Sequence, residues 1–260
     1  MRIYLFVSTT VRRLQSIQAR RLRRPSAPYR PQELCFAGRH DQSWPQNNKA
    51  PPRARNAVSG YPSADVSNLE SIQTAFGEAV GVLGGLDVLA NPAGIHRAAV
   101  TGEITVEDWD LVFAVNVRGT MITNQEAYPY LKESGGGSII NFGSISGQRA
   151  EAKAAAYSAT KGAVHAWTRS AAGAWGQDNI RVNAILPAMH TPMSRTAGKH
   201  LNEEQLNERY WRNYHGIALG RDYGDPDEDL GPVMVFMASD ASHFITGQLL
   251  PVDGGQTNVR

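Results

Sequence analysis

The sequence predicts an α/β fold, in which a doubly wound parallel sheet is covered by helices on both faces. From about residue 61, short apolar runs alternate with longer amphipathic ones, and this pattern is typical of parallel strands crossed by helices. The chain of 260 residues is long enough to bury a large core in one such domain. We therefore expect residues 1–260 to form a single domain that is regular over 61–260 and atypical over 1–60.

The first half of the regular part predicts helix, strand and helix in turn. The amphipathic run 71–83 indicates a helix, and the apolar run LDVLAN at 86–91 indicates a buried strand. A long helix is expected over 105–132, with Thr105 as its N-cap and Asp108 at the third helical position.

The second half continues the alternation. In order, we expect a strand at 138–144, a helix at 153–175, a strand at 180–186, a polar helix at 202–214, a helix at 225–239 and a strand with a glycine turn at 247–255. Acidic residues open the helix at 225, which suits the positive end of a helix dipole.

Charge divides the chain into two parts. Residues 1–60 hold eleven Arg and one Lys against Glu33 and Asp41, a net charge of +10, whereas residues 61–260 hold 14 basic and 22 acidic residues, a net charge of −8. Six of the fourteen prolines but only two of the 25 glycines lie in the first part. The two parts therefore need separate interpretations.

Several classes of function are disfavoured by composition. No apolar run approaches the ~18 residues of a membrane span, and the single cysteine, Cys35, cannot form an internal disulfide. We expect a cytoplasmic protein with no membrane partner. Nucleic-acid binding is not expected, because the basic opening interleaves few aromatic residues with its arginines. The seven histidines are scattered, so no metal site is expected.

Tyr157 and Lys161 are four residues apart in a predicted helix, a spacing that places both side chains on one face. A nearby ammonium favours the phenolate and lowers the tyrosine pKa, and the shifted group can exchange a proton with an alcohol or ketone. Taken alone, such a pair is more often part of an ordinary amphipathic helix.

Neighbouring segments strengthen the chemical interpretation. Ser144 ends a predicted strand, where open α/β sheets build their sites. Asn116 interrupts an apolar stretch inside a helix, although a satisfied core amide would look the same. Turns at 91–94 and 187–191 follow two other predicted strands.

Together these segments resemble the short-chain dehydrogenase/reductase family, which has a Rossmann-like fold. The matching pieces occur in family order over about three-quarters of the chain. They are DVSN (65–68), LDVLANPAG (86–94), VNVRG (115–119), SIINFGSISG (138–147), YSATK (157–161), IRVNAILPAMHTPM (180–193) and ITGQLLPVDGG (245–255). Residues 1–60 do not show the family pattern.

The resemblance implies a catalytic set. Tyr157 would be the general acid/base, and Lys161 would lower its pKa and hold the nicotinamide ribose. Ser144, rather than Ser146, would orient the substrate oxygen, so Ser144 and Tyr157 would both contact substrate. Asn116 would hold a water that links Lys161 to solvent.

The resemblance also implies a cofactor, NAD or NADP, that carries the hydride. Its binding residues would lie in three places: at the adenine, at the ribose and at the nicotinamide carboxamide. In that order they are Asp65 and Val66; Asn91, Ala93 and Gly94 together with Tyr157 and Lys161; and Pro187, Met189 and Thr191. Pro92 and Ala188 depart from the family residues Asn and Gly at their positions.

The phosphate loop is the largest departure from the family. Relatives carry TGxxxGxG between the first strand and helix, whereas the equivalent stretch 8–15, STTVRRLQ, contains no glycine. Side chains there should obstruct the backbone's approach to a pyrophosphate.

Three interpretations of residues 1–60 remain open. They could be a degenerate strand–helix–strand unit beginning with IYLFV (3–7), in which Arg39 would suit the 2′-phosphate of NADP. They could be an Arg-rich targeting peptide. They could instead be out-of-frame translation of a GC-rich gene, because Arg, Pro, Ser and Ala are enriched while periodicity is lost.

The predicted function is therefore an NAD(P)-dependent oxidoreductase that interconverts a secondary alcohol and a ketone. The alternative is a non-catalytic member of the fold without a working pyrophosphate loop. The resemblance implies a dimer or tetramer. Candidate substrate contacts are a mixed polar and aromatic set: Ile95, His96, Arg97, Gln148, Glu151 and a lid over 193–215 with Trp211, Tyr214 and His215.

Overall fold

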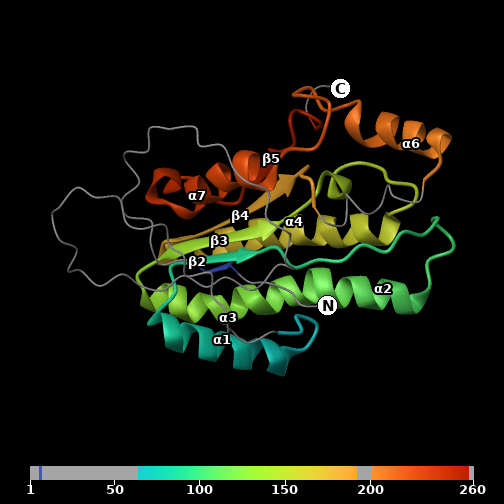
Figure 1. Cartoon of the computed structure of the whole chain (residues 1–260). Coiled ribbons are helices and arrows are strands. Elements are labelled where there is room, and N and C mark those ends of the chain that lie inside the picture. Colours follow the sequence, from blue (N-terminus) through green and yellow to red (C-terminus); the bar gives the residue numbers. More distant parts are fainter. Residues whose placement is uncertain (1–5, 8–63, 192–200, 258–260) are drawn as a thin grey trace.

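The structure, a computed structural model, describes residues 6–7, 64–191 and 201–257 (Figure 1). Its five-stranded sheet has the order β1-β2-β3-β4-β5. The strands are β1 (Phe6–Val7), β2 (Val88–Asn91), β3 (Gly137–Phe142), β4 (Ile180–Pro187) and β5 (Leu249–Val252).

The helices carry the labels of Figure 1. The α-helices are α1 (Leu69–Leu83), α2 (Val106–Phe113), α3 (Gly119–Glu133), α4 (Ala155–Trp175), α6 (Glu203–Arg209) and α7 (Gly231–Ala238). Short π-helices are η1 (Ala114–Arg118), η4 (Tyr210–Tyr214) and η5 (Pro226–Leu230), and 3₁₀-helices are η2 (Ile145–Gly147), η3 (Gly176–Asp178) and η6 (Asp240–Ser242).

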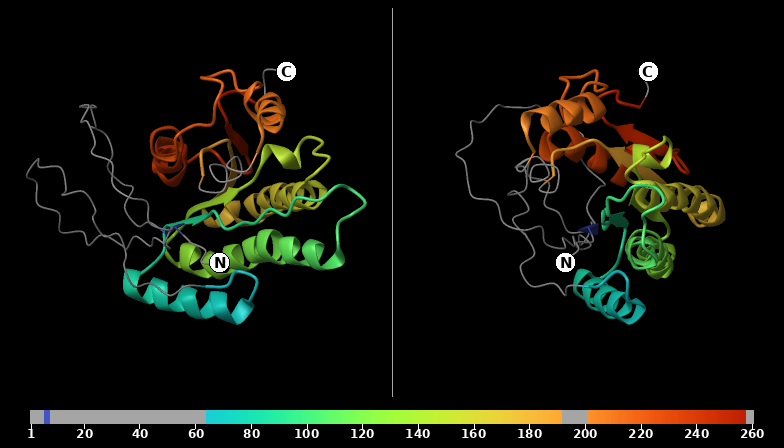
Figure 2. Two further views of the ribbon diagram at one scale, coloured as in Figure 1. Left: turned by 45° about the vertical axis from the view of Figure 1, so that its right-hand side comes forward. Right: turned by 90° about the vertical axis from the view of Figure 1, so that its right-hand side faces the viewer.

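The sheet has the predicted doubly wound form. Strands β2 to β5 are parallel, and Figure 2 shows α7 on one face and α1, α3 and α4 on the other. This confirms the α/β fold class.

Alternating apolar residues divide the core between the two faces. Leu89 and Ile139 pack with α1 and α3, whereas their neighbours Val88 and Ile140 pack with Met237 of α7. All five side chains are almost completely buried. Successive side chains of a strand point to opposite faces, so each parallel strand must be apolar on both sides, as the continuous apolar runs of the sequence indicated.

Strand β1 differs in direction from the other strands. Phe6 and Val7 pair antiparallel with Ala90 and Leu89 of β2. The first strand of a regular strand–helix–strand unit would run parallel to its neighbours. The helix and second strand of the unit proposed for residues 1–60 lie outside the described residues.

The long helix predicted over 105–132 is divided in the structure. Thr105 is its N-cap as predicted, accepting a hydrogen bond of 3.1 Å from the Asp108 amide. After α2, however, the chain forms the π-helix η1 before it continues as α3. Such π-turns inside α-helices are frequent at functional sites. The predicted helices at 202–214 and 225–239 likewise divide into α- and π-segments.

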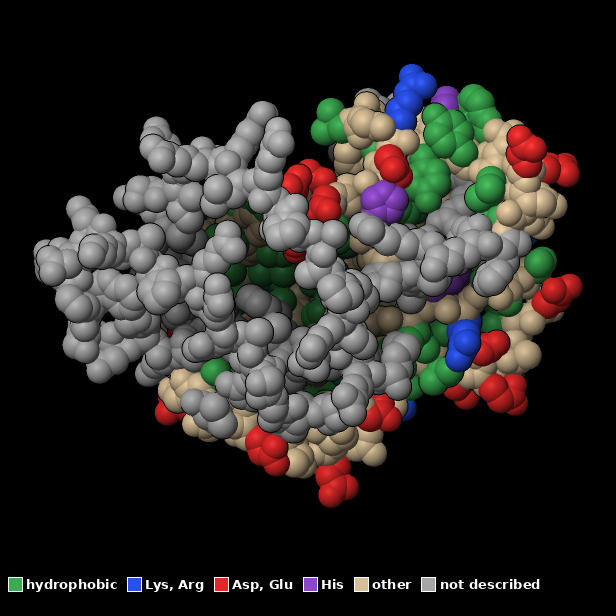
Figure 3. Space-filling model, viewed as in Figure 1, with side chains coloured by type: hydrophobic (Ala, Val, Ile, Leu, Met, Phe, Trp, Pro, Cys, Tyr) green, Lys and Arg blue, Asp and Glu red, His purple; other side chains and the backbone are tan. Residues whose placement is uncertain are grey.

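One face of the described surface carries acidic, polar and hydrophobic side chains. On the face shown in Figure 3, acidic side chains are spread over the described part, and basic side chains do not gather there. Among the described residues, no helix is long and apolar enough to cross a membrane.

Gly137, at the start of β3, lies very close to neighbouring atoms, and a substitution there can test this packing. A Cβ there would overlap the carbonyl oxygen of Asp87 and the side chain of Leu131. We expect Gly137→Ala to lower the free energy of unfolding by roughly 2–4 kcal/mol, because the backbone of Asp87 cannot move away without distorting the neighbouring structure. Urea denaturation would measure the loss.

The matched control is Gly77→Ala in α1. A Cβ at Gly77 has open space around it, so this change should stabilise the protein by roughly 0.5–1 kcal/mol. Equal effects of the two substitutions would contradict the close approach at Gly137.

Candidate active site

The carboxyl ends of three parallel strands meet at one edge of the sheet. Asn91 pairs with Asn141, and Phe142 pairs with Ile185, so β2, β3 and β4 end at neighbouring positions. Open α/β sheets bind ligands at this edge. Ser144 and Pro187 therefore belong to one region of the molecule, as the sequence predicted.

Helix α4 brings Tyr157 and Lys161 to this edge. Lys161 Nζ lies 5.5 Å from the ring centroid of Tyr157 and donates a 2.7 Å hydrogen bond to the carbonyl oxygen of Phe142, the last residue of β3. The lysine is 4% exposed. The predicted pair is therefore formed, and it is anchored to the strand beside Ser144.

The pKa of Tyr157 differs in direction from the prediction. Burial raises the pKa of the Tyr157 phenol above its ordinary value, and a hydrogen bond with Ser144 opposes this rise only in part. We had expected the neighbouring ammonium to lower the tyrosine pKa. Burial sets the direction of the shift, because a phenolate loses its hydration when it is removed from water.

Burial also acts on Lys161. It lowers the pKa of the ammonium from 10.5 to about 8. The group is therefore still mostly protonated at pH 7, but it loses its proton within reach of mildly alkaline solution.

Ser144 lies where β3 passes into η2. Its Oγ accepts a 3.2 Å hydrogen bond from the Ser146 amide and caps η2. The hydroxyl proton remains the group that Ser144 can direct at another oxygen. Ser146 supplies only its backbone amide to this contact.

Asn116 lies in η1 and is 1% exposed. Its Oδ1 accepts from the Ile95 amide at 2.8 Å, and its Nδ2 donates to the Ile95 carbonyl at 2.9 Å and to Thr160 Oγ1 at 3.0 Å. The side chain thus joins η1 to the segment after Gly94 and to α4. Its amide is used in these contacts, so a water relay would have to involve other atoms of the residue.

Gly94 lies against the side chains of Asn116 and Lys161. A Cβ there would lie 3.3 Å from Asn116 Oδ1 and 3.6 Å from Lys161 Nζ. Ala93, before it, is buried. Asn91 Nδ2 donates to Thr123 Oγ1 at 2.8 Å, while its buried Oδ1 has no hydrogen-bond partner within the described part of the chain.

Asp65 and Val66 form the turn before α1. Val66 is buried against Gly119, whose Cβ would lie 2.8 Å from the Val66 carbonyl oxygen. The Asp65 carboxylate accepts from the side chain and the amide of Ser67, and these bonds lower its pKa. This turn is therefore packed on the helix that follows Asn116.

The predicted carboxamide segment begins at the end of β4. Met189 forms a parallel bridge with Gly224 through its neighbours, because the His190 amide donates to the Gly224 carbonyl and the Gly224 amide donates to the Ala188 carbonyl. In such a bridge the amide and carbonyl of Met189 point the opposite way. Pro187 ends the strand, and Thr191 is exposed just before undescribed residues.

The substrate candidates divide into two groups. The His96 ring lies edge-on to Tyr157, with centroids 4.9 Å apart, and Glu151 acts on it electrostatically. Arg97 instead forms an exposed ion pair with Asp108 of α2, 3.7 Å away. His96 is thus placed beside the tyrosine with Glu151 acting on it, whereas Arg97 is paired with α2.

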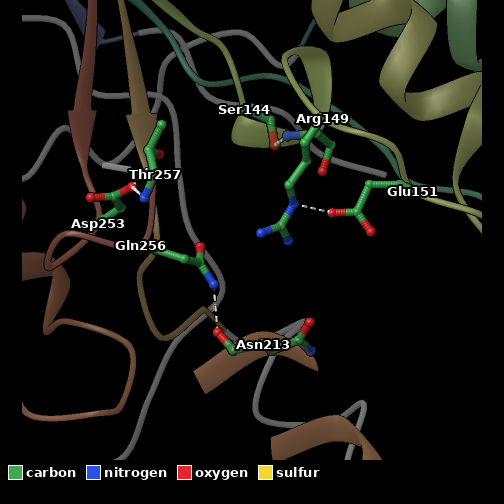
Figure 4. A network of polar contacts seen from close by, with 8 residues as sticks. Ser144, Arg149, Glu151, Asn213, Asp253, Gln256 and Thr257 are labelled. Carbon is green, nitrogen blue, oxygen red and sulfur yellow. Dashed lines mark hydrogen bonds and ion pairs between the residues drawn. The ribbon is translucent and has the colours of Figure 1, made fainter. Parts of the chain in front are cut away.

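Further polar contacts lie after Ser144 along the chain and in the carboxyl-terminal segment. Arg149 Nε and Glu151 Oε1 form a partly buried ion pair at 2.7 Å. Figure 4 shows this pair facing the segment where Gln256 donates to the Asn213 carbonyl. The carboxyl-terminal segment therefore holds η4, part of the predicted lid, opposite the Ser144 loop. Trp211 and His215 lie ring to ring at 4.2 Å in the same segment, and Gln148 is exposed.

Two residues near the site were not predicted from the sequence. Thr160 supplies a partner for Asn116, and His165 contacts the backbone of Ser144. Both could have been found by extending the helical face of Tyr157 and Lys161.

Arg39 and the stretch 8–15 lie outside the described residues. Within the described ranges, no group of three or more His, Cys, Asp or Glu could hold a metal ion.

The fold and this edge of the sheet define a class of nucleotide-dependent oxidoreductases. A family model described as "Enoyl-(Acyl carrier protein) reductase" matches residues 33–257. The chain belongs to the short-chain dehydrogenase/reductase family, whose dehydrogenases use NAD or NADP. The match begins at residue 33, earlier than the boundary near 61 that the motifs indicated.

Individual relatives agree with this assignment. Meso-2,3-butanediol dehydrogenase of Serratia marcescens is 36% identical over 193 residues, covering 74% of this chain and 73% of the relative. D-threitol dehydrogenase of Mycolicibacterium smegmatis is 33% identical over 209 residues, covering 78% and 75%. A solved putative short-chain alcohol dehydrogenase from Sinorhizobium meliloti 1021 has a TM-score of 0.67 at 31% identity, covering 74% of each chain.

The buried ammonium of Lys161 predicts a specific dependence of stability on pH. Between its folded pKa of about 8 and its ordinary value of 10.5, the unfolded chain binds more protons, so the free energy of unfolding rises with pH. The rise is at most about 1.4 kcal/mol per pH unit. Above about pH 10 the raised pKa of Tyr157 acts in the opposite direction, so the useful window is pH 8–10.

Urea denaturation of Lys161→Met and of the native chain between pH 7.5 and 9.5 would measure this rise. The variant should lose it, while replacement of the exposed Lys153 by Met should not change it. Identical pH dependence in the native chain and Lys161→Met would contradict the burial of a titrating ammonium.

Proposed function

We propose that this chain interconverts a secondary alcohol and a ketone, with Tyr157 as the general acid/base and NAD or NADP as the hydride carrier. The observation that carries the proposal is the meeting of Tyr157, Lys161 and Ser144 at the carboxyl end of β3. Such a grouping places a proton donor, a cation and an orienting hydroxyl around one substrate oxygen.

Tyr157 would act through its phenol. Since burial raises its pKa, the group stays protonated at neutral pH and can donate to the oxygen of a ketone as hydride adds to the carbonyl carbon. Ser144 would hold the same oxygen by its hydroxyl proton. In the reverse direction the phenolate must accept the alcohol proton, so oxidation should become faster as the pH rises.

Lys161 would stabilise the phenolate that forms when Tyr157 gives up its proton. Its ammonium already lies close to the ring and is held by the Phe142 carbonyl. At mildly alkaline pH this ammonium would itself deprotonate and weaken that stabilisation. Asn116 would keep η1 and α4 at a fixed separation through Thr160.

The described residues fit a nicotinamide cofactor. Gly94, which has no side chain, lies beside Lys161, and the backbone of Met189 presents its amide and carbonyl away from Gly224. The proposed binding residues are Asp65, Val66, Asn91, Ala93, Gly94, Tyr157, Lys161, Pro187, Met189 and Thr191. When bound, nicotinamide supplies or accepts the hydride. We leave the choice between NAD and NADP open.

We propose a small alcohol or ketone as substrate. Two relatives are named for butanediol and threitol, which supports a small hydroxyl-bearing molecule. His96 and Glu151 would contact it beside Tyr157. We further propose that residues 1–260 form one domain that works as a cytoplasmic dimer or tetramer, without a nucleic-acid or membrane partner.

The alternative function is binding without catalysis. It is favoured by the absence of glycine from residues 8–15, the stretch that should carry the pyrophosphate loop. Calorimetric titration with NAD(H) and NADP(H) separates the two. Binding supports the enzyme, whereas no binding at millimolar nucleotide supports the alternative.

Replacement of Tyr157 by Phe tests the chemistry directly. Turnover of a ketone with NADH or NADPH should fall by about 10²–10⁴-fold, because general acid catalysis contributes this much. Nucleotide affinity measured by fluorescence should change little.

Tyr130→Phe in α3 is the matched control and should keep native turnover. If activity persisted in Tyr157→Phe at a level similar to this control, the proposed mechanism would be wrong.

A further inference from the structure

His165 is a buried titratable group to which the proposed mechanism assigns no role. It lies on α4, one turn after Lys161 and two turns after Tyr157, and is 3% exposed. Spacings of four residues keep all three side chains on one face of the helix. The face that carries the acid/base therefore also carries an imidazole.

The imidazole of His165 contacts the backbone of Ser144. The Ser144 amide donates a 3.3 Å hydrogen bond to His165 Nε2. A backbone N–H can only donate, so Nε2 must be unprotonated and the neutral ring carries its proton on Nδ1. Burial, with Arg169 and Lys161 nearby, lowers the pKa of His165 to about 4, which agrees with a neutral ring.

Two glycines fit around this ring. A Cβ at Gly143 would lie 2.5 Å from His165 Nε2, and a Cβ at Gly147 would lie 2.8 Å from His165 Cε1. These glycines bracket Ser144, at one position before it and three after it. The loop that carries the serine is therefore seated directly on the imidazole, with no room for side chains between them.

We propose that His165 is a positioning residue of the active site, whose neutral imidazole holds the Ser144 backbone so that the serine hydroxyl stays aligned with Tyr157. This inference rests on the proposed function. Helix α4 would then position both side chains that contact the substrate oxygen. Tyr157 belongs to α4, and the backbone of Ser144 is hydrogen-bonded to His165 of the same helix. The helix thereby sets the separation between donor and orienting hydroxyl.

Three substitutions separate the hydrogen bond from the volume of the ring. Gln can place an oxygen near the position of Nε2, whereas Leu fills the space without an acceptor and Asn is too short to reach. We expect His165→Leu and His165→Asn to lower kcat/KM about tenfold, the worth of one such bond. His165→Gln should restore most of it. His243→Leu, at an exposed histidine, should have no effect.

A double-mutant cycle with Ser144→Ala tests whether His165 acts through the serine. In the Ser144→Ala background, His165→Leu should lower kcat/KM much less than in the native chain, because the aligned hydroxyl is already absent. Full additivity, or equal losses in His165→Gln and His165→Leu, would overturn the proposal. Should the Leu variant fail to fold, the comparison of Asn with Gln gives the same decision.

Hydrogen exchange at the Ser144 amide distinguishes failure of this inference from failure of the proposed function. Protection should be kept in His165→Gln and lost in His165→Leu or His165→Asn. A native chain without any nucleotide-dependent turnover would contradict the proposed function, yet this amide would still show whether His165 holds Ser144. Equal protection in all variants would overturn the inference whatever the activity.

Discussion

The site depends on the packing of α4 against the carboxyl end of β3. Lys161 Nζ reaches the carbonyl of the last residue of β3, and His165 receives the amide of Ser144 just beyond it. Two polar side chains of one helix thus satisfy two backbone groups where the sheet ladder ends, and such groups are costly to bury unpaired. Strand, loop and helix are therefore placed together, and Tyr157 is carried into the site with them.

Because α4 packs closely on β3, Lys161 is buried and Tyr157 is partly buried, and burial shifts the pKa of both side chains. It raises the pKa of Tyr157 and lowers that of Lys161, so each group moves toward its neutral form. These shifts do not oppose proton transfer from the phenol at neutral pH, because the donor must start protonated. In the proposed mechanism the lysine would keep enough of its charge at neutral pH to favour the phenolate once formed. The close packing of α4 on β3 thus determines both the position of the two side chains and how strongly each holds its proton.

Most of the regular fold could be predicted, because apolar periodicity directly reports which faces are buried. Helical spacing placed Tyr157 beside Lys161, and a predicted strand end placed Ser144. Their grouping in one site came from the family resemblance. The π-turn that holds Asn116 was missed because a single short π-turn lies within an otherwise helical stretch. His165 was missed because a lone histidine on an apolar face looks like an ordinary core residue, and its role depends on a contact 21 positions away.

Hydrogen bonds within the described part of the chain hold the proposed site on the α4 side. Those of Asn116, Ser144 and Lys161 join residues between 95 and 165. A defective phosphate loop would therefore weaken nucleotide binding while leaving the proton-transfer groups in place. Loss of binding energy that is equal in ground and transition states raises KM and leaves kcat unchanged. We therefore expect the glycine-free stretch to raise the KM for the nucleotide. Substitutions that disturb the contact between α4 and β3 should instead lower kcat.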